Sequence, residues 1–338
     1  MQERLKSINR MIEQPKVSIL VPVYGVERYI ERCTESLMEQ TYEDIEYIFV
    51  DDATPDRSIE ILEDVVARYP KRRSQVRILQ HKNNKGLSAA RNTAVAAAVG
   101  MYMLHVDSDD YIAKEAIEKL VYAAQTSKAD IVIFDTIELR KDGEVLFQAE
   151  YKNRETYIKG LLQHTNRCAH WNKFYRTDFY KHTGIQSVEN VRLGEDYAVT
   201  PRLVHQAKKI SVLHEGLYCY ETRNQSSYVH NLNRAAIESH HTAERVLIDY
   251  FSQVEDKAIW TDTIVLLSQR SISSLLKHSN RKTWPIIREI YHQELAQCGN
   301  GLKPVDKIIY DLFRSNHAYL LSSFLTFYRF VYSLFGSK

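Results

Sequence analysis

The sequence predicts an α/β fold, in which a mostly parallel sheet is flanked by helices and followed by a helical C-terminal region. Short apolar, β-branched runs alternate with amphipathic helical patterns between residues 17 and 135. Beyond residue 234 only helical patterns recur. The chain has 338 residues, of which 44% are hydrophobic and 26% charged, and this composition suits one large globular domain and a smaller one.

Five apolar segments are expected to be strands. The first reads Val-Ser-Ile-Leu-Val-Pro-Val over 17–23, which is typical of a parallel strand buried on both faces. The others are 45–50, 76–79, 102–106 and 131–134. In a sheet of this type, ligands bind at the carboxyl ends of the strands.

Helical patterns occupy the segments between these strands, and a hairpin follows the last one. The helices are expected at 26–37, 59–66, 87–99 and from about Ala113. Gly100 is expected to end the third helix, because glycine tolerates the left-handed conformation. Residues 137–148, with Lys141-Asp-Gly143 at their centre, indicate the hairpin, whereas 156–220 gives mixed signals.

The C-terminal part is predicted to be helical, with long helices over 235–251 and 260–276. We therefore expect an α/β domain over residues 1–232 and a helical region over 233–338. The tail, 319–336, repeats leucine and aromatic residues at helical spacing. Two interpretations stay open for it: a helix packed on its own domain, or a helix lying on a membrane surface.

Composition excludes several classes of protein. Lysine and arginine total 45 against 43 acidic residues, a net charge of +2, which argues against a nucleic-acid binder. The four cysteines lie far apart without metal-ligand spacing, as expected in a reducing compartment. Residues 1–14 lack the apolar core of a signal peptide, and no run of 18 uncharged apolar residues exists. We therefore expect a cytoplasmic protein.

Polar clusters follow three of the predicted strands. They are Pro22-Val-Tyr24, Asp51-Asp52 and Asp107-Ser-Asp109-Asp110. Carboxylates gathered at one edge of a sheet repel one another, and a divalent cation that bridges to a diphosphate would relieve this. Two simpler roles stay open: a helix cap for Asp109 or Asp110, and a turn-former for Asp52.

Four ordered segments resemble the consecutive blocks of family 2 glycosyltransferases, which are inverting enzymes of the GT-A fold that use nucleotide sugars. The segments read VSILVPVY at 17–24, YIFVDDAT at 47–54, NKGLSAARN at 84–92 and HVDSDDY at 105–111. The resemblance covers about residues 15–228.

This resemblance implies roles for the residues at the strand ends. The loop after the first strand and the second aspartate after the next strand would hold the base, with uridine favoured because a carboxylate accepts the uracil N3–H. The glycine and arginine of the third block would face the nucleotide and its phosphates. Asp107 would lie near the ribose and the metal, and Asp109 would bind Mg²⁺ or Mn²⁺, with Asp110 as the alternative ligand. The implied nucleotide-binding residues are Pro22, Val23, Tyr24, Asp52, Gly86, Arg91, Asp107, Asp109 and Arg223.

Inversion also needs a base that accepts the proton of the acceptor hydroxyl. Gly194-Glu-Asp-Tyr197 matches the family's E-D block, which implies Asp196 as the catalytic base and Glu195 as its supporting carboxylate. Trp171-Asn-Lys173 matches a W-x-K block with an acceptor-side or a structural role. Arg223, with Ser226 or Ser227, matches a segment that would close over the diphosphate, although an arginine in a polar loop is more often solvated.

The resemblance implies transfer of a hexose or N-acetylhexosamine from a UDP-sugar to a glycan or lipid-linked acceptor, in the synthesis of capsule or another cell-surface polysaccharide. A second copy of the chain and the cytoplasmic face of the inner membrane are further candidate partners. The alternatives are an inactive module that binds glycans or nucleotides, and a sugar nucleotidyltransferase. The latter would need a glycine-rich loop after the first strand, whereas 22–27 holds one glycine. The absence of GxGxxG there excludes a dehydrogenase.

Overall fold

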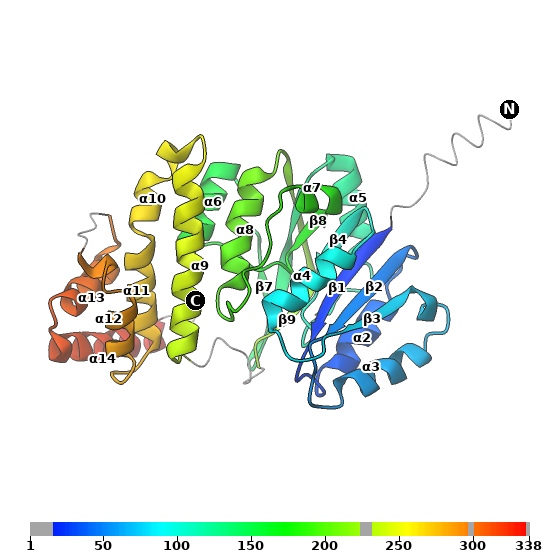
Figure 1. Ribbon diagram of the computed structural model, residues 1–338, viewed down its shortest axis with the longest axis horizontal. Coiled ribbons are helices and arrows are strands. Elements are labelled where there is room, and N and C mark those ends of the chain that lie inside the picture. Colours follow the sequence, from blue (N-terminus) through cyan, green and yellow to red (C-terminus); the bar gives the residue numbers. More distant parts are fainter. Residues whose placement is uncertain (1–15, 224–231, 297–300, 336–338) are drawn as a thin grey trace. The chain divides into compact units, whose positions relative to one another are not determined.

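The computed structural model describes residues 16–223, 232–296 and 301–335 (Figure 1). The chain divides into two compact units. Unit 1 comprises Met1–Arg154, Cys168–Asn190 and Arg202–Asn224, and unit 2 comprises Glu155–Arg167, Val191–Pro201 and Gln225–Lys338. The predicted α/β architecture with a helical C-terminal region is confirmed.

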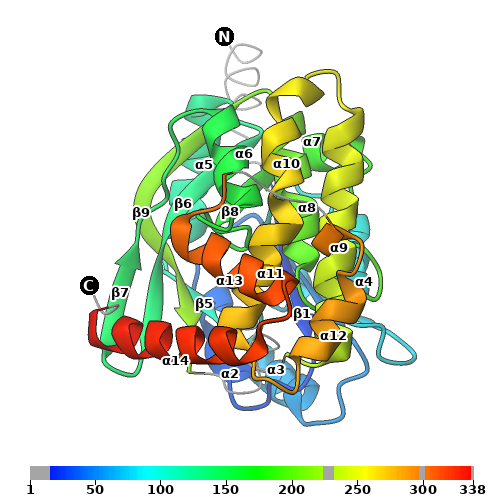
Figure 2. The same ribbon diagram turned by 90° about the vertical axis from the view of Figure 1, so that its left-hand side faces the viewer.

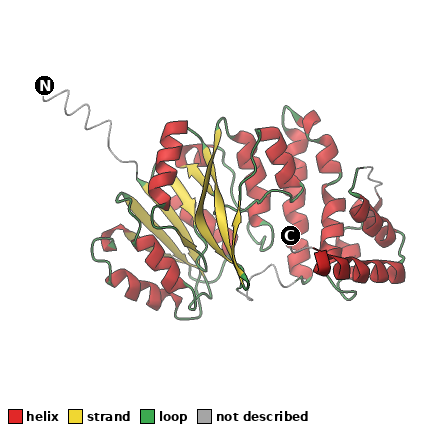
Figure 3. Cartoon of the chain, turned by 180° about the vertical axis from the view of Figure 1, so that it is seen from behind, coloured by secondary structure: helices red, strands yellow, loops and turns green. Residues whose placement is uncertain are grey.

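Unit 1 is built on one sheet (Figure 3). Within the described residues its strand order is β3-β2-β1-β4-β8-β6-β9-β5, and β7 pairs with β6. The strands are β1 (Val17–Val23), β2 (Ile45–Asp51), β3 (Val76–Gln80), β4 (Tyr102–His105), β5 (Tyr111–Ile112), β6 (Ile131–Arg140), β7 (Gly143–Phe147), β8 (Lys173–Arg176) and β9 (Ile210–Glu221).

The sheet is mixed because β8 lies antiparallel between β4 and β6. As a result β1, β2, β3, β4, β6 and β9 run in one direction, and β5, β7 and β8 run in the other. The hairpin predicted over 137–148 is confirmed as β6–β7, but the strand expected at 131–134 continues into it without a break.

Helices cover both faces of the sheet. Alternate residues of β1 (Val17, Ile19, Val21 and Val23) share one apolar core with α2, α3 and α5. Helix α4 packs against β1 and β2, and none of its residues belongs to that core. A strand covered in this way buries every side chain, which explains the unbroken apolar sequence of β1. The helices are α2 (Ile30–Met38), α3 (Ser58–Ala67), α4 (Leu87–Ala97), α5 (Ala116–Ser127) and α7 (Thr177–His182), with a short 3₁₀ turn at Arg73–Gln75.

Gly100 has a different role from the one expected. Helix α4 ends at Ala97, and Ala98 is already extended, with φ −64° and ψ 132°. Gly100 instead passes close to β1: a Cβ atom there would lie 2.7 Å from both Lys16 O and Ser18 N. Its N–H donates to Ser18 Oγ (2.9 Å) and to Glu46 Oε1 (3.1 Å). Glycine is therefore required for close approach of backbones, not for a left-handed cap.

The strand ends predicted to carry the site meet at one edge of unit 1. Val23 at the end of β1 is paired with Asp51 at the end of β2. On the other side of β1, Leu20 is paired with His105, the last residue of β4. The loops that follow β1, β2 and β4 therefore leave the sheet from the same edge.

Unit 2 is helical in its described residues, with its own apolar core. The helix predicted at 235–251 is confirmed as α9, whereas the one predicted at 260–276 is two helices that meet at Leu266, where φ −88° and ψ −7° depart from helical values. No described helix is long and apolar enough to cross a membrane. The helices are α9 (Arg234–Gln253), α10 (Thr261–Val265), α11 (Leu267–His278), α12 (Trp284–Ile290), α13 (Pro304–Arg314) and α14 (Ala318–Phe335), with 3₁₀ turns at Lys257–Ile259 and Glu294–Ala296; α6 (Arg154–Leu162) lies almost wholly in unit 2, and α8 (Glu195–Gln206) starts there.

We expect Gly100→Ala to lower the free energy of unfolding of unit 1 by about 1–3 kcal/mol, because the added methyl group would overlap backbone atoms of β1. Urea unfolding followed by circular dichroism measures this. The control is Val99→Ala at the exposed neighbouring position, which should change stability by no more than about 0.5 kcal/mol. Equal stabilities of the two variants would show that β1 can move away from Gly100.

Candidate active site

The loops after β1 and β2 are joined by hydrogen bonds. The N–H of Asp52 donates to Val23 O (3.1 Å), and the N–H of Gly25 donates to Thr54 Oγ1 (2.8 Å). Pro22 and Val23 are buried within β1, whereas Tyr24 is 43% exposed. Of the three residues predicted from this segment, Tyr24 is therefore the one whose side chain can meet a ligand.

Asp52 is buried, and its carboxylate shapes the loop that leads into α4. Oδ1 accepts the N–H of Lys85 (2.8 Å) and contacts His81 Nδ1 (2.6 Å), and Oδ2 accepts the N–H of Gly86 (2.7 Å). Gly86 has φ +87°, a conformation that L side chains rarely adopt, and immediately precedes α4. No sequence motif marks His81, which also contacts Thr93 Oγ1 at 2.9 Å.

Arg91 connects α4 with the acidic loop after β4. It is buried, and its Nη2 donates to Asp107 Oδ1 at 2.8 Å. The side chain of Asp107 keeps about a quarter of its surface exposed. Two residues predicted for the phosphate and metal side of the site are thus in direct contact.

Asp109 and Asp110 differ sharply in their surroundings. Asp110 is fully buried and accepts hydrogen bonds from Tyr218 Oη (2.6 Å) and from the N–H of Glu221 (2.7 Å). Burial, followed by the charges of Asp109 and Asp107, raises its pKa well above the ordinary value. Asp109 is partly exposed. Because α5 begins only at Ala116 and has no side-chain cap, neither aspartate caps it.

Tyr218 supports the acidic loop from β9. Besides donating to Asp110, its hydroxyl accepts the N–H of Asp107 at 3.0 Å. Its ring is fully buried and stacks on Trp171, with 4.7 Å between ring centroids. Lys173 is also buried, and its Nζ donates to Ala169 O (2.8 Å) and Asn172 Oδ1 (2.7 Å). These contacts give Trp171 and Lys173 a structural role in unit 1.

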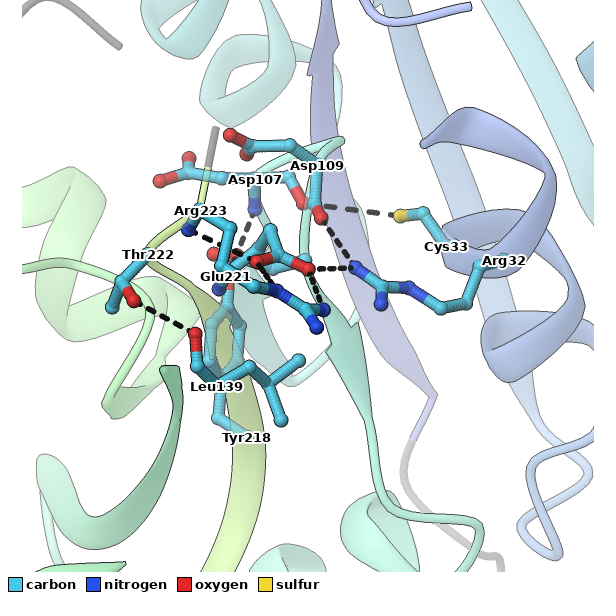
Figure 4. Close-up of polar contacts among 10 residues, drawn as sticks. Arg32, Cys33, Asp107, Asp109, Leu139, Tyr218, Glu221, Thr222 and Arg223 are labelled. Atoms are coloured by element: carbon cyan, nitrogen blue, oxygen red, sulfur yellow. Dashed lines mark hydrogen bonds and ion pairs between the residues drawn. The ribbon is translucent and has the colours of Figure 1, made fainter. Parts of the chain in front are cut away.

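Two arginines meet the buried carboxylate of Glu221 beside this loop (Figure 4). Arg223 donates to it through Nε and Nη2, both at 2.6 Å, and Arg32 Nη2 donates to it at 3.2 Å. The Arg223 hydrogen bonds are the first cause that lowers the pKa of Glu221 to about 2. Arg32 Nη2 also donates to Asp109 O (3.1 Å). No motif marks Arg32 or Glu221, and their contact joins positions 189 apart in the sequence. Ser226 and Ser227 lie outside the described residues.

A pair of histidines lies beneath this edge of the sheet. His105 and His170 are buried with ring centroids 4.9 Å apart. Burial, and then the charge of Arg91, lowers the pKa of His105 to about 3, and burial together with His105 lowers that of His170. Both imidazoles are therefore neutral around neutral pH.

Glu195 and Asp196 form the first turn of α8 and belong to unit 2. Glu195 is buried, whereas Asp196 is partly exposed and its Oδ1 accepts the N–H of Tyr197 (2.7 Å). Gly194, with φ +88°, brings this turn close to α9: a Cβ on it would lie 3.3 Å from Ala243 Cβ. The backbone conformation at Gly194 thus sets the position of Glu195 and Asp196 at the start of α8.

The donor set of the acidic loop fits a hard divalent cation. Asp107 and Asp109 are the partly exposed members, and carboxylate oxygens are the ligands that Mg²⁺ and Mn²⁺ prefer. Burial raises the pKa of Asp110 first, and the charges of Asp109 and Asp107 raise it further, so negative charge is concentrated in this loop. Across the described residues no group of three or more His, Cys, Asp or Glu side chains forms a metal site, so two carboxylates would need other oxygens to complete the coordination.

Comparison with known proteins matches the chain to glycosyltransferases. The family model described as "Glycosyl transferase family 2" matches residues 18–184. The chain is 34% identical over 234 residues to the uncharacterized glycosyltransferase EpsJ of Bacillus subtilis, covering 67% of this chain and 66% of EpsJ. It is 30% identical over 220 residues to the glycosyltransferase GlyG of Streptococcus pneumoniae, covering 62% of this chain and 72% of GlyG.

The fold is that of a solved relative. Residues 1–349 of TarS from Staphylococcus aureus, crystallised with UDP-GlcNAc, match with a TM-score of 0.74 at 20% identity, over 93% of this chain and 91% of the TarS chain. TarS is described as a poly(ribitol-phosphate) beta-N-acetylglucosaminyltransferase; in sequence it is 28% identical over 216 residues, 63% of this chain and 37% of full-length TarS. The GT-A fold expected from the sequence is thereby confirmed, and the chain belongs to glycosyl transferase family 2.

Proposed function

We propose that the protein is an inverting glycosyltransferase that moves a hexose or N-acetylhexosamine from a UDP-sugar to a glycan or lipid-linked acceptor. One observation carries the proposal: at one edge of the unit 1 sheet, Asp52 holds Gly86 at the start of α4, and Arg91 of α4 contacts Asp107 in the loop that also holds Asp109. The UDP-GlcNAc bound by TarS and its polymer-modifying activity support the donor class and a role in cell-surface polysaccharide synthesis.

The nucleotide would bind against the loops after β1 and β2. Tyr24 offers its exposed ring to the base, while Asp52 holds the 85–86 loop and accepts the uracil N3–H with the remaining lone pair on Oδ2. The phosphates would face the start of α4, where backbone N–H groups and the helix dipole favour anions, with Arg91 adding its charge. The nucleotide would thus lie between the loop after β1 and the start of α4.

Asp107 and Asp109 would hold Mn²⁺ or Mg²⁺ together with oxygens of the diphosphate. When bound, the metal stabilises the negative charge that develops on the departing nucleotide. Asp110 is better suited to hold the loop than to bind the ion, because both of its oxygens accept internal hydrogen bonds. The Arg223 side chain is about half exposed, so it would be able to leave Glu221 and pair with the diphosphate instead.

Asp196 is proposed as the base that takes the proton from the acceptor hydroxyl as the anomeric carbon is attacked. Within the described residues its Oδ1 accepts one backbone hydrogen bond and its Oδ2 has no donor, so one oxygen is available to a hydroxyl group. Glu195, buried beside it, would support its orientation. We further propose that the protein binds its acceptor near Asp196, forms a homodimer and associates with the cytoplasmic face of the membrane.

Asp109→Asn should weaken the binding of UDP in the presence of Mn²⁺ by at least about tenfold, because a neutral amide is a poor ligand for a hard cation. Titration calorimetry with UDP, in Mn²⁺ and in EDTA, measures the effect. Asp64→Asn, an exposed position on α3, is the matched control and should behave as the wild type. If UDP affinity is the same with and without Mn²⁺ in the wild-type protein, the metal assignment is wrong.

Asp196→Asn should leave UDP binding unchanged and lower turnover by roughly 10²–10⁴-fold, because the amide cannot accept the proton. Release of UDP from a panel of UDP-sugars in Mn²⁺ measures turnover and identifies the donor sugar. Asp249→Asn, at an exposed position of α9 in the same unit, serves as the control. Normal turnover in Asp196→Asn would show that another residue is the base. If the wild type releases no UDP from any UDP-sugar, the protein is better described as a module that only binds glycans or nucleotides.

A further inference from the structure

Helix α14 is shown face-on in Figure 2. One of its faces is apolar and exposed. Leu321 and Leu325 are buried in the core of unit 2. On the opposite side Tyr319 is 79%, Leu320 59%, Phe327 66% and Phe330 60% exposed. At 100° per residue these four side chains fall within one sector of the helix, where Ser323 separates the first pair from the second. We call these four side chains the α14 stripe.

The chemistry around the α14 stripe is basic. No acidic residue occurs in α14. The guanidinium of Arg281 lies over the ring of Tyr319, 5.0 Å from its centroid, and among the described residues no carboxylate pairs with it. Lys282 beside it is exposed. The exposed cations and the apolar stripe thus lie together on unit 2.

A pocket of about 260 Å³ lies beside the first turn of α14, and Arg281, which covers Tyr319 of the stripe, is part of its lining. Its lining includes the side chains of Arg281 and Arg288 together with Trp284, Asn316 and Leu321. Arg288 is held in place by the carbonyl oxygen of Phe313 and by stacking over its ring at 4.5 Å. Two arginines and an amide that line a pocket together with apolar side chains are suited to an anionic phosphate group that carries an apolar tail.

We infer that unit 2 docks on an anionic phospholipid bilayer, with α14 lying flat in the interfacial layer and the Arg281–Arg288 pocket holding a lipid phosphate. The buried leucines on the other side of α14 keep the helix attached to its unit, so the stripe alone enters the lipid. Aromatic side chains suit this layer because their rings tolerate both the apolar and the polar side of it. A basic rim adds attraction to anionic lipids that salt should screen.

The test uses the full chain and vesicles of phosphatidylcholine, with and without phosphatidylglycerol, in a co-sedimentation assay. The wild type should bind the anionic vesicles, and added salt should weaken this binding. The double variant Phe327→Ser/Phe330→Ser should lose binding roughly tenfold or more, because two exposed aromatic anchors are removed. Arg281→Gln should reduce the preference for phosphatidylglycerol.

The matched control is Val265→Ser, which removes an exposed apolar side chain from α10 of the same unit and should bind as the wild type does. No binding by the wild type, or equal binding by the double variant, would overturn the inference. A dimer that the double variant disrupts, without vesicle binding by the wild type, would instead make the stripe an interface between copies of the chain. UDP release from a soluble donor should be unaffected throughout, which separates this outcome from failure of the proposed function.

Discussion

The hydroxyl group of Tyr218 holds the acidic loop of unit 1 in one conformation. It donates to the buried carboxylate of Asp110 and accepts the backbone N–H of Asp107, and so it ties together both ends of the DSDD segment. A buried carboxylate without donors would cost several kcal/mol, whereas here both oxygens are satisfied. Because Tyr218 holds the loop from its buried side, Asp107 and Asp109 keep fixed positions while remaining partly exposed. The proposed contacts of Asp107 and Asp109 with a metal and the diphosphate depend on that tie.

The arginines distribute charge around the same loop. Arg91 meets Asp107 from α4, while Arg32 and Arg223 meet Glu221 from α2 and from the end of β9. Charge-assisted pairs of this kind are short and directional, so they order side chains that would otherwise repel or move apart. Ion pairs connect three separate segments of the chain to one small region, and the sequence places these segments up to 189 positions apart.

The sequence predicted the parts of the fold that local pattern determines. β1, β2 and β4 were found because they are buried along their whole length and are mostly apolar, and the partly buried β3 was found from its Val-x-Ile-Leu pattern. β8 was missed because it is four residues long and reads Lys-Phe-Tyr-Arg, and β9 was missed because its first half is only partly buried. The loops after β1, β2 and β4 leave the sheet at one edge, as a parallel arrangement of these strands predicts. Their internal partners, such as His81 for Asp52 and Tyr218 for Asp110, could not be predicted, since these contacts depend on the folded positions of distant segments. The distinction between Asp109 and Asp110 likewise rests on burial, which their adjacent positions in the sequence do not reveal.

The buried pair His105 and His170 has a consequence for the stability of the protein in acid. In an unfolded chain an imidazole takes up a proton below a pH of about 6.5. In the folded protein His105 does so only at about 3, and His170 is depressed as well. Proton uptake therefore favours the unfolded chain as the pH falls from about 6.5 toward 3. Mild acid weakens the scaffold itself, and loss of activity in that range would report melting of the sheet as well as titration of its catalytic groups.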